Sequence, residues 1–468
     1  MPGRGLRGAS WRAAMLALGL AVFVVASEAP ANGAKNDAAL EASYQRYLTA
    51  IRTARNTIQS SPLIRDAADR AQGDSFLKGI VDYSLAAALD LTPDHPLLEA
   101  LPRPNEREGF NNPDNLYYVA RVSDQGSYRI TGTRGTSTGF LVQAFSHGLP
   151  GYGTAAGATT ASVADTDLHP AADGSFSITL SAQRPAKGDW MQLAPGTDNL
   201  LVRFSFLDWQ QEKRGSIKIT RIGGSPSNRA AMTPVVAAAM LDDAAQGIQL
   251  QAQFYRDQGV ALSSLGANKL IGPRQAQGQQ GTNVQQWNLT GNYDLAADQA
   301  LLVTIKDAPQ AKYSGFMAAT PFLDTLEFVH HQVSLNHDQV HVDSDGNIRY
   351  VLSAQDPGVP NWIDTTGQLH GTIFGRWQEV PGVLGPEYAP TLTVLPLSGV
   401  RAALPPDTPT VTRAQRAAQL AQRQRLLQAR FTGADPKRSE LLRRFTKMQA
   451  LVGHKIAGQS LFDTGLRG

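Results

Sequence analysis

The chain reads ADGSFSITLSAQRPAKGDW over residues 172–190 and SDGNIRYVLSAQDPGVPNW over residues 344–362. Aligned without a gap, the eighteen positions that begin at Asp173 and Asp345 share eight residues: Asp, Gly, Leu, Ser, Ala, Gln, Pro and Trp. In both copies an Asp-Gly pair precedes a strand-like run, which is typical of a tight turn that opens a β-hairpin. The recurrence of one such unit indicates an internal duplication.

Strand-like segments surround both copies. Short runs of this kind, separated by Gly-, Asp- and Pro-rich turns, favour antiparallel sandwiches. We therefore predict a mainly β protein with flanking helices and two duplicated antiparallel β-sandwich (jelly-roll-like) domains, in which Trp190 and Trp362 occupy equivalent places. The predicted strands are 116–122, 127–133, 139–145, 175–181, 199–207 and 216–222, then 300–306, 313–318, 326–335, 348–353, 372–378 and 391–395.

Helical sequence frames the β segments. Residues 37–91 and 228–258 carry apolar residues at helix spacing, and the chain becomes helical again after Pro405-Pro406. The predicted division is a signal peptide (1–34), a helical N-terminal region (35–104), a first β-sandwich (105–225), a helical linker with a Gln/Gly-rich loop (226–285), a second β-sandwich (286–400) and a basic helical C-terminal tail (401–468).

The first residues resemble an export signal. Arg4, Arg7 and Arg12 precede fourteen apolar or small residues, 13–26. This run has the length of a signal-peptide core and is shorter than the roughly 20 residues of a membrane span. Cleavage after Ala31 or Ala34 fits the small residues that follow. We expect an exported protein, periplasmic or secreted.

Composition excludes several classes of protein. The chain has 468 residues, 42% hydrophobic and 18% charged, and no cysteine, so disulfides, thiolate metal sites and cysteine nucleophiles are excluded. It contains no P-loop, no G-x-G-x-x-G after a strand, no H-E-x-x-H and no G-x-S-x-G.

The net charge of +3 hides an asymmetry. Residues 411–468 hold twelve Lys or Arg and three Asp or Glu, a net +9, which leaves −6 on the rest. A solvated helix pair is the favoured interpretation of this tail, with apolar faces at Leu420, Gln424, Leu427 and Phe431 and at Leu441, Phe445, Met448 and Val452. Contact with an envelope component or an anionic membrane surface is the alternative, and we expect no nucleic-acid partner.

The richest polar segment that the copies do not share begins at Asp356. Asp356, Asn361, Trp362, Asp364, His370, Arg376 and Trp377 bring together two carboxylates, an amide, indoles, an imidazole and a guanidinium. If the protein is an enzyme, Asp356, Asp364 and His370 are the candidate acids and bases. The other four are candidate ligand-binding residues, because guanidinium groups hold anions and indoles pack on rings. A purely structural role, in which Arg376 pairs with Asp364 or Asp356 and closes the sandwich, is the favoured interpretation of this segment taken alone.

Two further clusters of polar residues are candidate sites. In the first copy, Arg203, Asp208 and Trp209 form either a ligand rim or a salt-bridged corner, together with Asp114, Asn115, Tyr117, Tyr118, Arg134 and Glu212. In the second copy, His330, His331, His337, His341 and His370 could approach a metal with Asp338 or Asp343. Their spacing matches no standard metal motif, so we predict surface or hydrogen-bonded histidines, no metal and no cofactor.

A family resemblance covers most of residues 105–430. DPGVPNWIDTTGQLHGTIFGRWQ (356–378), with SLNHDQVHVDSDGNIRYVLS before it, resembles the signature of the bacterial domain-of-unknown-function 1214 family. Segments 112–122, 189–209 and 405–424 are similar to other parts of such proteins. The resemblance implies an exported or envelope-associated β-sandwich fold and no established activity.

These observations leave three functions open. The favoured one is recognition of a small or oligomeric polar ligand, carbohydrate or lipid-derived, between the two sandwiches. The second is a hydrolase, lyase or isomerase that uses carboxylates and histidine of the second sandwich. The third is a structural envelope protein whose inter-sandwich grooves are filled by side chains.

Overall fold

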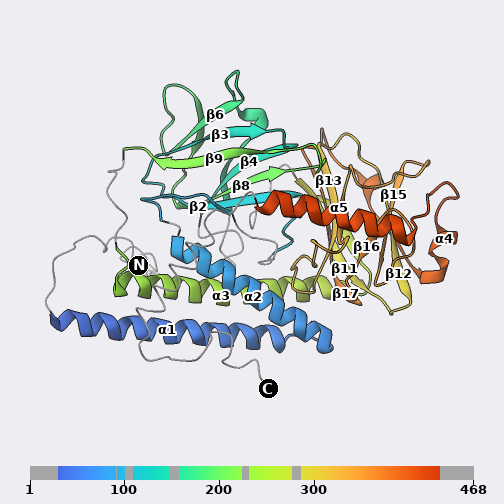
Figure 1. The fold of residues 1–468 in the computed structure, drawn as a ribbon, viewed down its shortest axis with the longest axis horizontal. Coiled ribbons are helices and arrows are strands. Elements are labelled where there is room, and N and C mark those ends of the chain that lie inside the picture. The colour runs from blue at the N-terminus through green and yellow to red at the C-terminus, as the bar shows by residue number, and fades with distance from the viewer. Residues whose placement is uncertain are drawn as a thin grey trace, which may run out of the picture.

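A computed structural model describes residues 30–90, 92–100, 109–146, 158–223, 231–276 and 286–432. Two groups of strands lie side by side above a layer of three helices, and a further helix crosses the junction between them (Figure 1). The predicted signal core and the apolar face from Leu441 to Val452 lie outside the described residues. The fold is mainly β with flanking helices, as predicted.

The first group of strands is a two-sheet sandwich. One sheet has the order β1-β2-β8-β4-β5 and the other the order β7-β6-β3-β9. Phe140 of β4 meets Phe176 of β6 between the sheets, with ring centroids 5.1 Å apart. The strands are β1 (Glu99–Ala100), β2 (Asn115–Arg121), β3 (Tyr128–Gly135), β4 (Gly139–Ser146), β5 (Ala158–Ala164), β6 (Ser175–Ser181), β7 (Asp189–Gln192), β8 (Thr197–Ser205) and β9 (Arg214–Arg221).

The second group repeats this arrangement strand for strand. Its sheets have the orders β10-β11-β17-β13-β14 and β16-β15-β12-β18. Phe316 and Tyr350 stack between the sheets at 4.2 Å. The strands are β10 (Leu270–Gln275), β11 (Gln286–Asp294), β12 (Gln299–Lys306), β13 (Tyr313–Ala319), β14 (Ser334–Asn336), β15 (Asn347–Ser353), β16 (Trp362–Asp364), β17 (His370–Gln378) and β18 (Thr391–Pro396).

The two quoted segments occupy equivalent places in their sandwiches. In each copy the turn leads into a strand that pairs in parallel with the short Trp-bearing strand, β6 with β7 and β15 with β16. Trp190 Nε1 donates to the carbonyl of Ser181 at 3.2 Å, and Trp362 Nε1 donates to the carbonyl of Ser353 at 3.1 Å. The predicted duplication of the fold is confirmed, with these two parallel pairs as exceptions to the antiparallel pattern.

Some strands of the second sandwich differ from the prediction. The expected strand 326–335 is reduced to β14, because the Glu327 carboxylate accepts the backbone N–H groups of Val329 and His330 and bends the chain. β10 lies within 226–285, the stretch predicted as linker, yet it pairs with β11 because Leu270 packs against the sandwich core.

Helices cover the sheets on two sides. α1 (Pro30–Gln59), α2 (Ala67–Asp90) and α3 (Pro234–Ser263) pack on one another, and Phe76 of α2 stacks on Phe322 at 5.6 Å. Tyr83 and Ala87 of α2 cover the outer face of the first sandwich. α4 (Val400–Ala403) covers the second sandwich, and α5 (Arg413–Thr432) crosses the junction.

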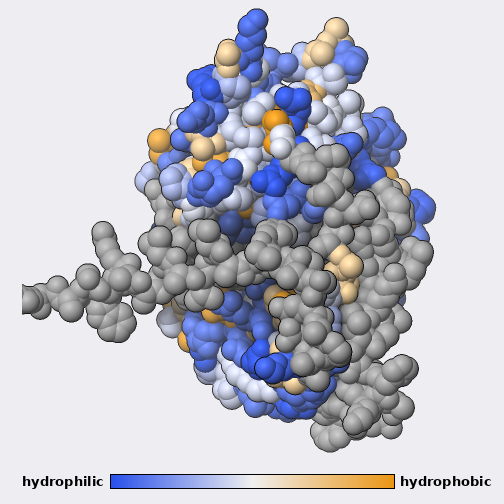
Figure 2. Space-filling model, turned by 90° about the vertical axis from the view of Figure 1, so that its left-hand side faces the viewer, coloured by the Kyte–Doolittle hydropathy of each residue, from blue (hydrophilic) through white to orange (hydrophobic). Residues whose placement is uncertain are grey.

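The surface of the described residues is polar over the face shown in Figure 2, where hydrophobic residues are scattered. Among the described helices, none combines the length and apolar character needed to cross a bilayer.

Candidate binding groove between the sandwiches

A groove of about 500 Å³ opens where the two sandwiches meet α5. Three segments that are distant in the sequence form its walls: the turn after β8, the region around β14 with Pro360, and one side of α5. Its lining is rich in amide and carboxylate groups. It consists of Leu207, Asp208, Trp209, Gln210, Gln332, Leu335, Asp338, Gln339, Pro360, Gln419, Gln422, Arg423 and Leu426.

The first wall is a tight turn that Asp208 and Glu212 hold in place. Asp208 Oδ1 accepts the backbone N–H groups of Gln210 and Gln211 at 2.8 and 3.1 Å. Glu212 Oε1 accepts the backbone N–H groups of Leu207 and Asp208 at 3.2 and 3.1 Å. This network fixes the position of Trp209, between the sandwich core and the groove.

Asp114 is the polar centre of the junction. Its carboxylate is 1% exposed and accepts hydrogen bonds from Trp209 Nε1 at 2.8 Å, Asn336 Nδ2 at 2.8 Å and the Tyr313 hydroxyl at 2.6 Å. Trp209 belongs to the first sandwich, whereas Asn336 and Tyr313 belong to the second. A buried carboxylate is stabilised only when several donors satisfy its oxygens. Asp114 therefore ties the two groove walls together.

Three arginines of α5 point inward at seven-residue intervals: Arg416, Arg423 and Arg430. Arg423 donates to the carbonyls of Phe328 and Ser334, and its guanidinium lies 4.7 Å from the Trp209 ring. Arg430 lies at the same distance from that ring and donates to the carbonyl of Pro113. The prediction of a solvated helix is wrong for these residues, since they and Leu427 form the packed face of α5.

Gln424, which was predicted to lie on the apolar face, is exposed. The buried face of α5 includes Arg416, Arg423 and Leu427, and Gln424 lies one residue beyond Arg423, outside that face.

Burial lowers the pKa of Arg423 and of Arg430 to about 10, and the nearby Asp114 carboxylate opposes this shift. Both guanidinium groups therefore remain charged at neutral pH.

Asp338 is an exposed carboxylate of the second wall. Partial desolvation raises its pKa, and the charges of Asp208, Glu212 and Asp114 add to this effect, while His337 opposes it. A carboxyl group whose pKa is raised loses its proton at a higher pH than an ordinary aspartate does.

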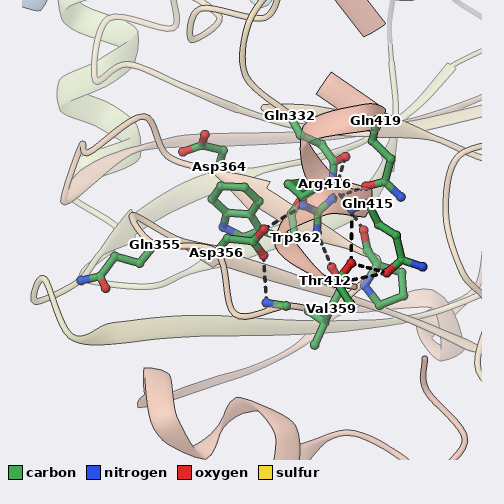
Figure 3. A network of polar contacts seen from close by, with 12 residues as sticks. Gln332, Gln355, Asp356, Val359, Trp362, Asp364, Thr412, Gln415, Arg416 and Gln419 are labelled. Atoms are coloured by element: carbon green, nitrogen blue, oxygen red, sulfur yellow. Dashed lines mark hydrogen bonds and ion pairs between the residues drawn. The ribbon is translucent and has the colours of Figure 1, made fainter. Parts of the chain in front are cut away.

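The predicted segment 356–362 is fastened to α5 (Figure 3). Asp356 Oδ2 accepts from Arg416 Nε at 2.9 Å, and its Oδ1 accepts from the backbone N–H of Gly358 at 2.8 Å. Arg416 also donates to the carbonyl of Val359 at 2.6 Å and lies 5.2 Å from the Trp362 ring. Asp356 and Trp362 thus hold the helix in place, and Pro360 is the residue of this segment that lines the groove.

Asn361, Asp364 and His370 also have intramolecular partners. The Asn361 amide exchanges two 2.7 Å hydrogen bonds with the backbone of His341. Asp364 Oδ2 lies 2.7 Å from His331 Nδ1, and His370 Nε2 lies 2.7 Å from Oδ1 of Asp69 in α2. These residues lie outside the groove lining.

Of the two predicted arginines on equivalent strands, Arg376 is buried and Arg203 is half-buried. Arg376 donates to the carbonyl of Phe110 at 3.1 Å and stacks on Phe374 at 4.4 Å, rather than pairing with Asp356 or Asp364. Arg203 lies 5.8 Å from the Tyr117 ring, and burial lowers its pKa to about 10. Arg376 and Trp377 border a cavity of about 10 Å³, which is too small for any ligand.

The five clustered histidines each lie beside a different carboxylate. Among the described residues, no three His, Asp or Glu side chains are placed to hold a metal ion. The pairs are His330 with Glu327, His331 with Asp364, His337 with Asp307, His341 with Asp343 and His370 with Asp69.

Of the predicted site residues, Asp208 and Trp209 line the groove. The glutamines of the lining were not among the predicted site residues, and Asp338 was predicted only as a candidate metal ligand. The sequence does contain one pattern that predicts the packed face of the helix beside the groove. Arg416, Arg423 and Arg430, with Leu420 and Leu427 between them, follow heptad spacing, which indicates a packed helix face.

Comparison with known structures supports the architecture. An uncharacterized protein from Burkholderia cenocepacia matches with a TM-score of 0.72 at 26% identity, over 79% of this chain and 100% of that chain. The VPA0106 protein from Vibrio parahaemolyticus is more distant, with a TM-score of 0.38 at 14% identity, over 69% of this chain and 98% of that one. Neither a family model nor a curated protein matches, so the resemblance to the domain-of-unknown-function 1214 family stays a prediction.

Proposed function

We propose that this protein binds a polar, uncharged, hydroxyl-rich ligand, such as a short carbohydrate, in the groove between its sandwiches. The supporting observation is the lining itself, in which five glutamines and two aspartates surround about 500 Å³. Amides donate and accept at once, as sugar hydroxyls do, and carboxylates accept from hydroxyl donors. The volume lies within the range of small-molecule sites, about 300–1,000 Å³.

The charges of the groove favour a neutral ligand over an anion. Arg423 is the cation of the lining, and its guanidinium is already engaged by the carbonyls of Phe328 and Ser334. Asp208 and Asp338 would repel an anion. A neutral polyol satisfies the amides and carboxylates without opposing these charges.

Binding to a panel of neutral oligosaccharides, measured by titration calorimetry, tests this proposal. Gln422→Ala removes an amide from the α5 wall and should weaken binding about tenfold, as expected for the loss of one or two hydrogen bonds. Gln424→Ala is the matched control, because Gln424 is on the same helix but exposed outside the lining. If no oligosaccharide binds, or if both variants bind as the wild type does, the proposal is wrong.

An enzyme is the second candidate, and the raised pKa of Asp338 is the observation that favours it. Asp338 and Asp208 line the same groove, and two carboxyl groups with different surroundings are the usual acid and base of such an enzyme. In that case Asp338→Asn should abolish turnover of the bound saccharide while leaving its binding within a few-fold. Product analysis by mass spectrometry distinguishes an enzyme from a binding protein.

We also propose that the protein works outside the cytoplasm. The support is the sequence of residues 1–34, with its basic start and apolar run. Fractionation of cells that express the full chain, with N-terminal sequencing of the product, tests this. A product that retains Met1 in the cytoplasmic fraction would contradict it.

A further inference from the structure

The two sandwiches differ most on one outer face. In the second sandwich, Leu302 of β12 and Val351 of β15 lie side by side on the outside of their sheet. Both are buried, because Val400 and Leu404 pack over them in one apolar cluster. This face is therefore closed by the protein itself.

The equivalent face of the first sandwich is polar and open. The aligned segments place Leu180 at the position of Leu352, and these residues pair with Tyr128 and Leu301 respectively. The residue after Tyr128 on β3 is Arg129, and the residue after Leu301 on the equivalent strand β12 is Leu302. Arg129 is exposed and pairs with Thr179.

Hydroxyl and cationic side chains cover this face in rows across three strands. One row is Thr179, Arg129 and Thr220, the next is Ser177, Thr131 and Lys218, and the third is Ser175, Thr133 and Ser216. These nine positions include no Asp or Glu. Asp173, on the turn before β6, is engaged with the backbone of Ser175.

An indole borders the same face. Trp190 of β7 pairs with Thr179 and is half-buried, whereas Trp362, its counterpart, is buried beneath α5. The Arg184 guanidinium lies 5.6 Å from the Trp190 ring and is exposed. The open face therefore combines three exposed cations, Arg129, Lys218 and Arg184, with rows of hydroxyls and a partly accessible aromatic ring.

We propose that this outer face binds an extended acidic polysaccharide. The cations complement its carboxylates, the Ser and Thr hydroxyls match its hydroxyls, and the open sheet accepts a chain rather than a compact molecule. An anionic membrane surface is disfavoured, because no large apolar side chain of β3, β6 or β9 is exposed to insert into lipid. The site is separate from the groove and does not depend on the function proposed there.

The probe is sodium polygalacturonate, titrated with the full chain at low ionic strength. Wild-type protein should bind, and the affinity should fall steeply as salt is added, because exposed charges carry the interaction. The double variant Arg129→Ala/Lys218→Ala should bind at least tenfold more weakly. Arg413→Ala/Arg425→Ala is the matched control, since it removes two exposed α5 cations and should bind as the wild type does.

Three further measurements test the specificity of this face: binding of an uncharged polymer, binding by a variant of the groove, and binding of anionic lipid vesicles. Fully methyl-esterified polygalacturonate, which lacks the charges, should not bind. Gln422→Ala should bind polygalacturonate normally, so failure of the groove proposal does not affect this one. The proposal is overturned if polygalacturonate does not bind, if the double variant binds it normally while keeping its unfolding midpoint, or if phosphatidylglycerol vesicles bind more tightly and lose the same affinity in that variant.

Discussion

The hydroxyl of Tyr313, on β13 of the second sandwich, donates a 2.6 Å hydrogen bond to Oδ2 of Asp114, which immediately precedes β2 of the first. The same hydroxyl accepts from Asn112 Nδ2 at 2.7 Å. Burial raises the pKa of Tyr313 well above its usual value, and the Asp114 charge adds to this shift, so the phenol stays protonated as a donor. The buried Tyr313 hydroxyl therefore links the second sandwich to the segment that precedes β2 of the first.

Tyr313→Phe should destabilise the protein by about 1–3 kcal/mol, because it removes the hydroxyl that donates to Asp114 Oδ2 and accepts from Asn112 Nδ2, both of which are buried. Denaturant unfolding of the two proteins measures this difference. Tyr388→Phe is the control, since the Tyr388 hydroxyl accepts from the exposed Gln310, which water can replace. Equal stability of both variants would contradict a junction held by Asp114.

Arg423→Ala should cost about 2–4 kcal/mol of unfolding free energy, since it strips hydrogen bonds from two buried carbonyls and leaves a cavity beside Trp209. Arg425→Ala, two residues away on the exposed side of α5, should change stability by less than about 0.5 kcal/mol. Thermal unfolding of the pair checks this contrast, and similar losses in both would mean that α5 is not packed through its arginines.

His370→Ala should destabilise the protein by about 1–3 kcal/mol, because Asp69 is 1% exposed and would lose the imidazole that lies 2.7 Å away. His169, which is exposed and pairs with Asp189, offers the comparison, and His169→Ala should have an effect below about 1 kcal/mol. If His370→Ala instead left stability unchanged and abolished ligand binding, His370 would be a functional residue rather than a tie between α2 and β17.

Asp345 provides a test by pH. A hydrogen bond from Arg349 lowers the pKa of Asp345 below its usual value, with a smaller contribution from Asn347. Because the folded pKa is below the unfolded one, the stabilisation is complete above about pH 4 and is lost as the pH falls below it. Asp345→Asn should therefore lower the unfolding free energy at pH 7, by less than about 1 kcal/mol at this exposed position. The difference from the wild type should shrink at pH 3; an equal difference at both pH values would exclude this pair as its source.

Local patterns in the sequence predicted much of the fold. The Asp-Gly turns and the segments after them identified β6 and β15, and helix spacing identified α1, α2 and α3. β11 was missed because its sequence, QWNLTGNYD, mixes polar and apolar residues on both faces. Its Gly291 lies so close to β10 that an added Cβ would be 1.8 Å from the carbonyl oxygen of Lys269, a constraint that only the paired strand reveals.

The groove could not be predicted in the same way. Its walls come from 207–210, 332–339, 360 and 419–426, and no local spacing indicates that these segments meet. The segment from Asp356 to Arg376 was predicted as a site because its polar residues are close together in the sequence. Those residues satisfy one another and the backbone, whereas the groove is lined by isolated glutamines that carry no motif.

One apolar core runs through both sandwiches, from Leu116 of the first to Leu427 of the helix that spans them. A protein made of two like halves invites dissection into those halves. Here each sandwich covers apolar side chains of the other, so a fragment that contains one sandwich alone would expose residues that are buried in the full chain. The two sandwiches have the same topology, yet they share one core and are not expected to fold separately. The smallest fragment suitable for study therefore contains both copies.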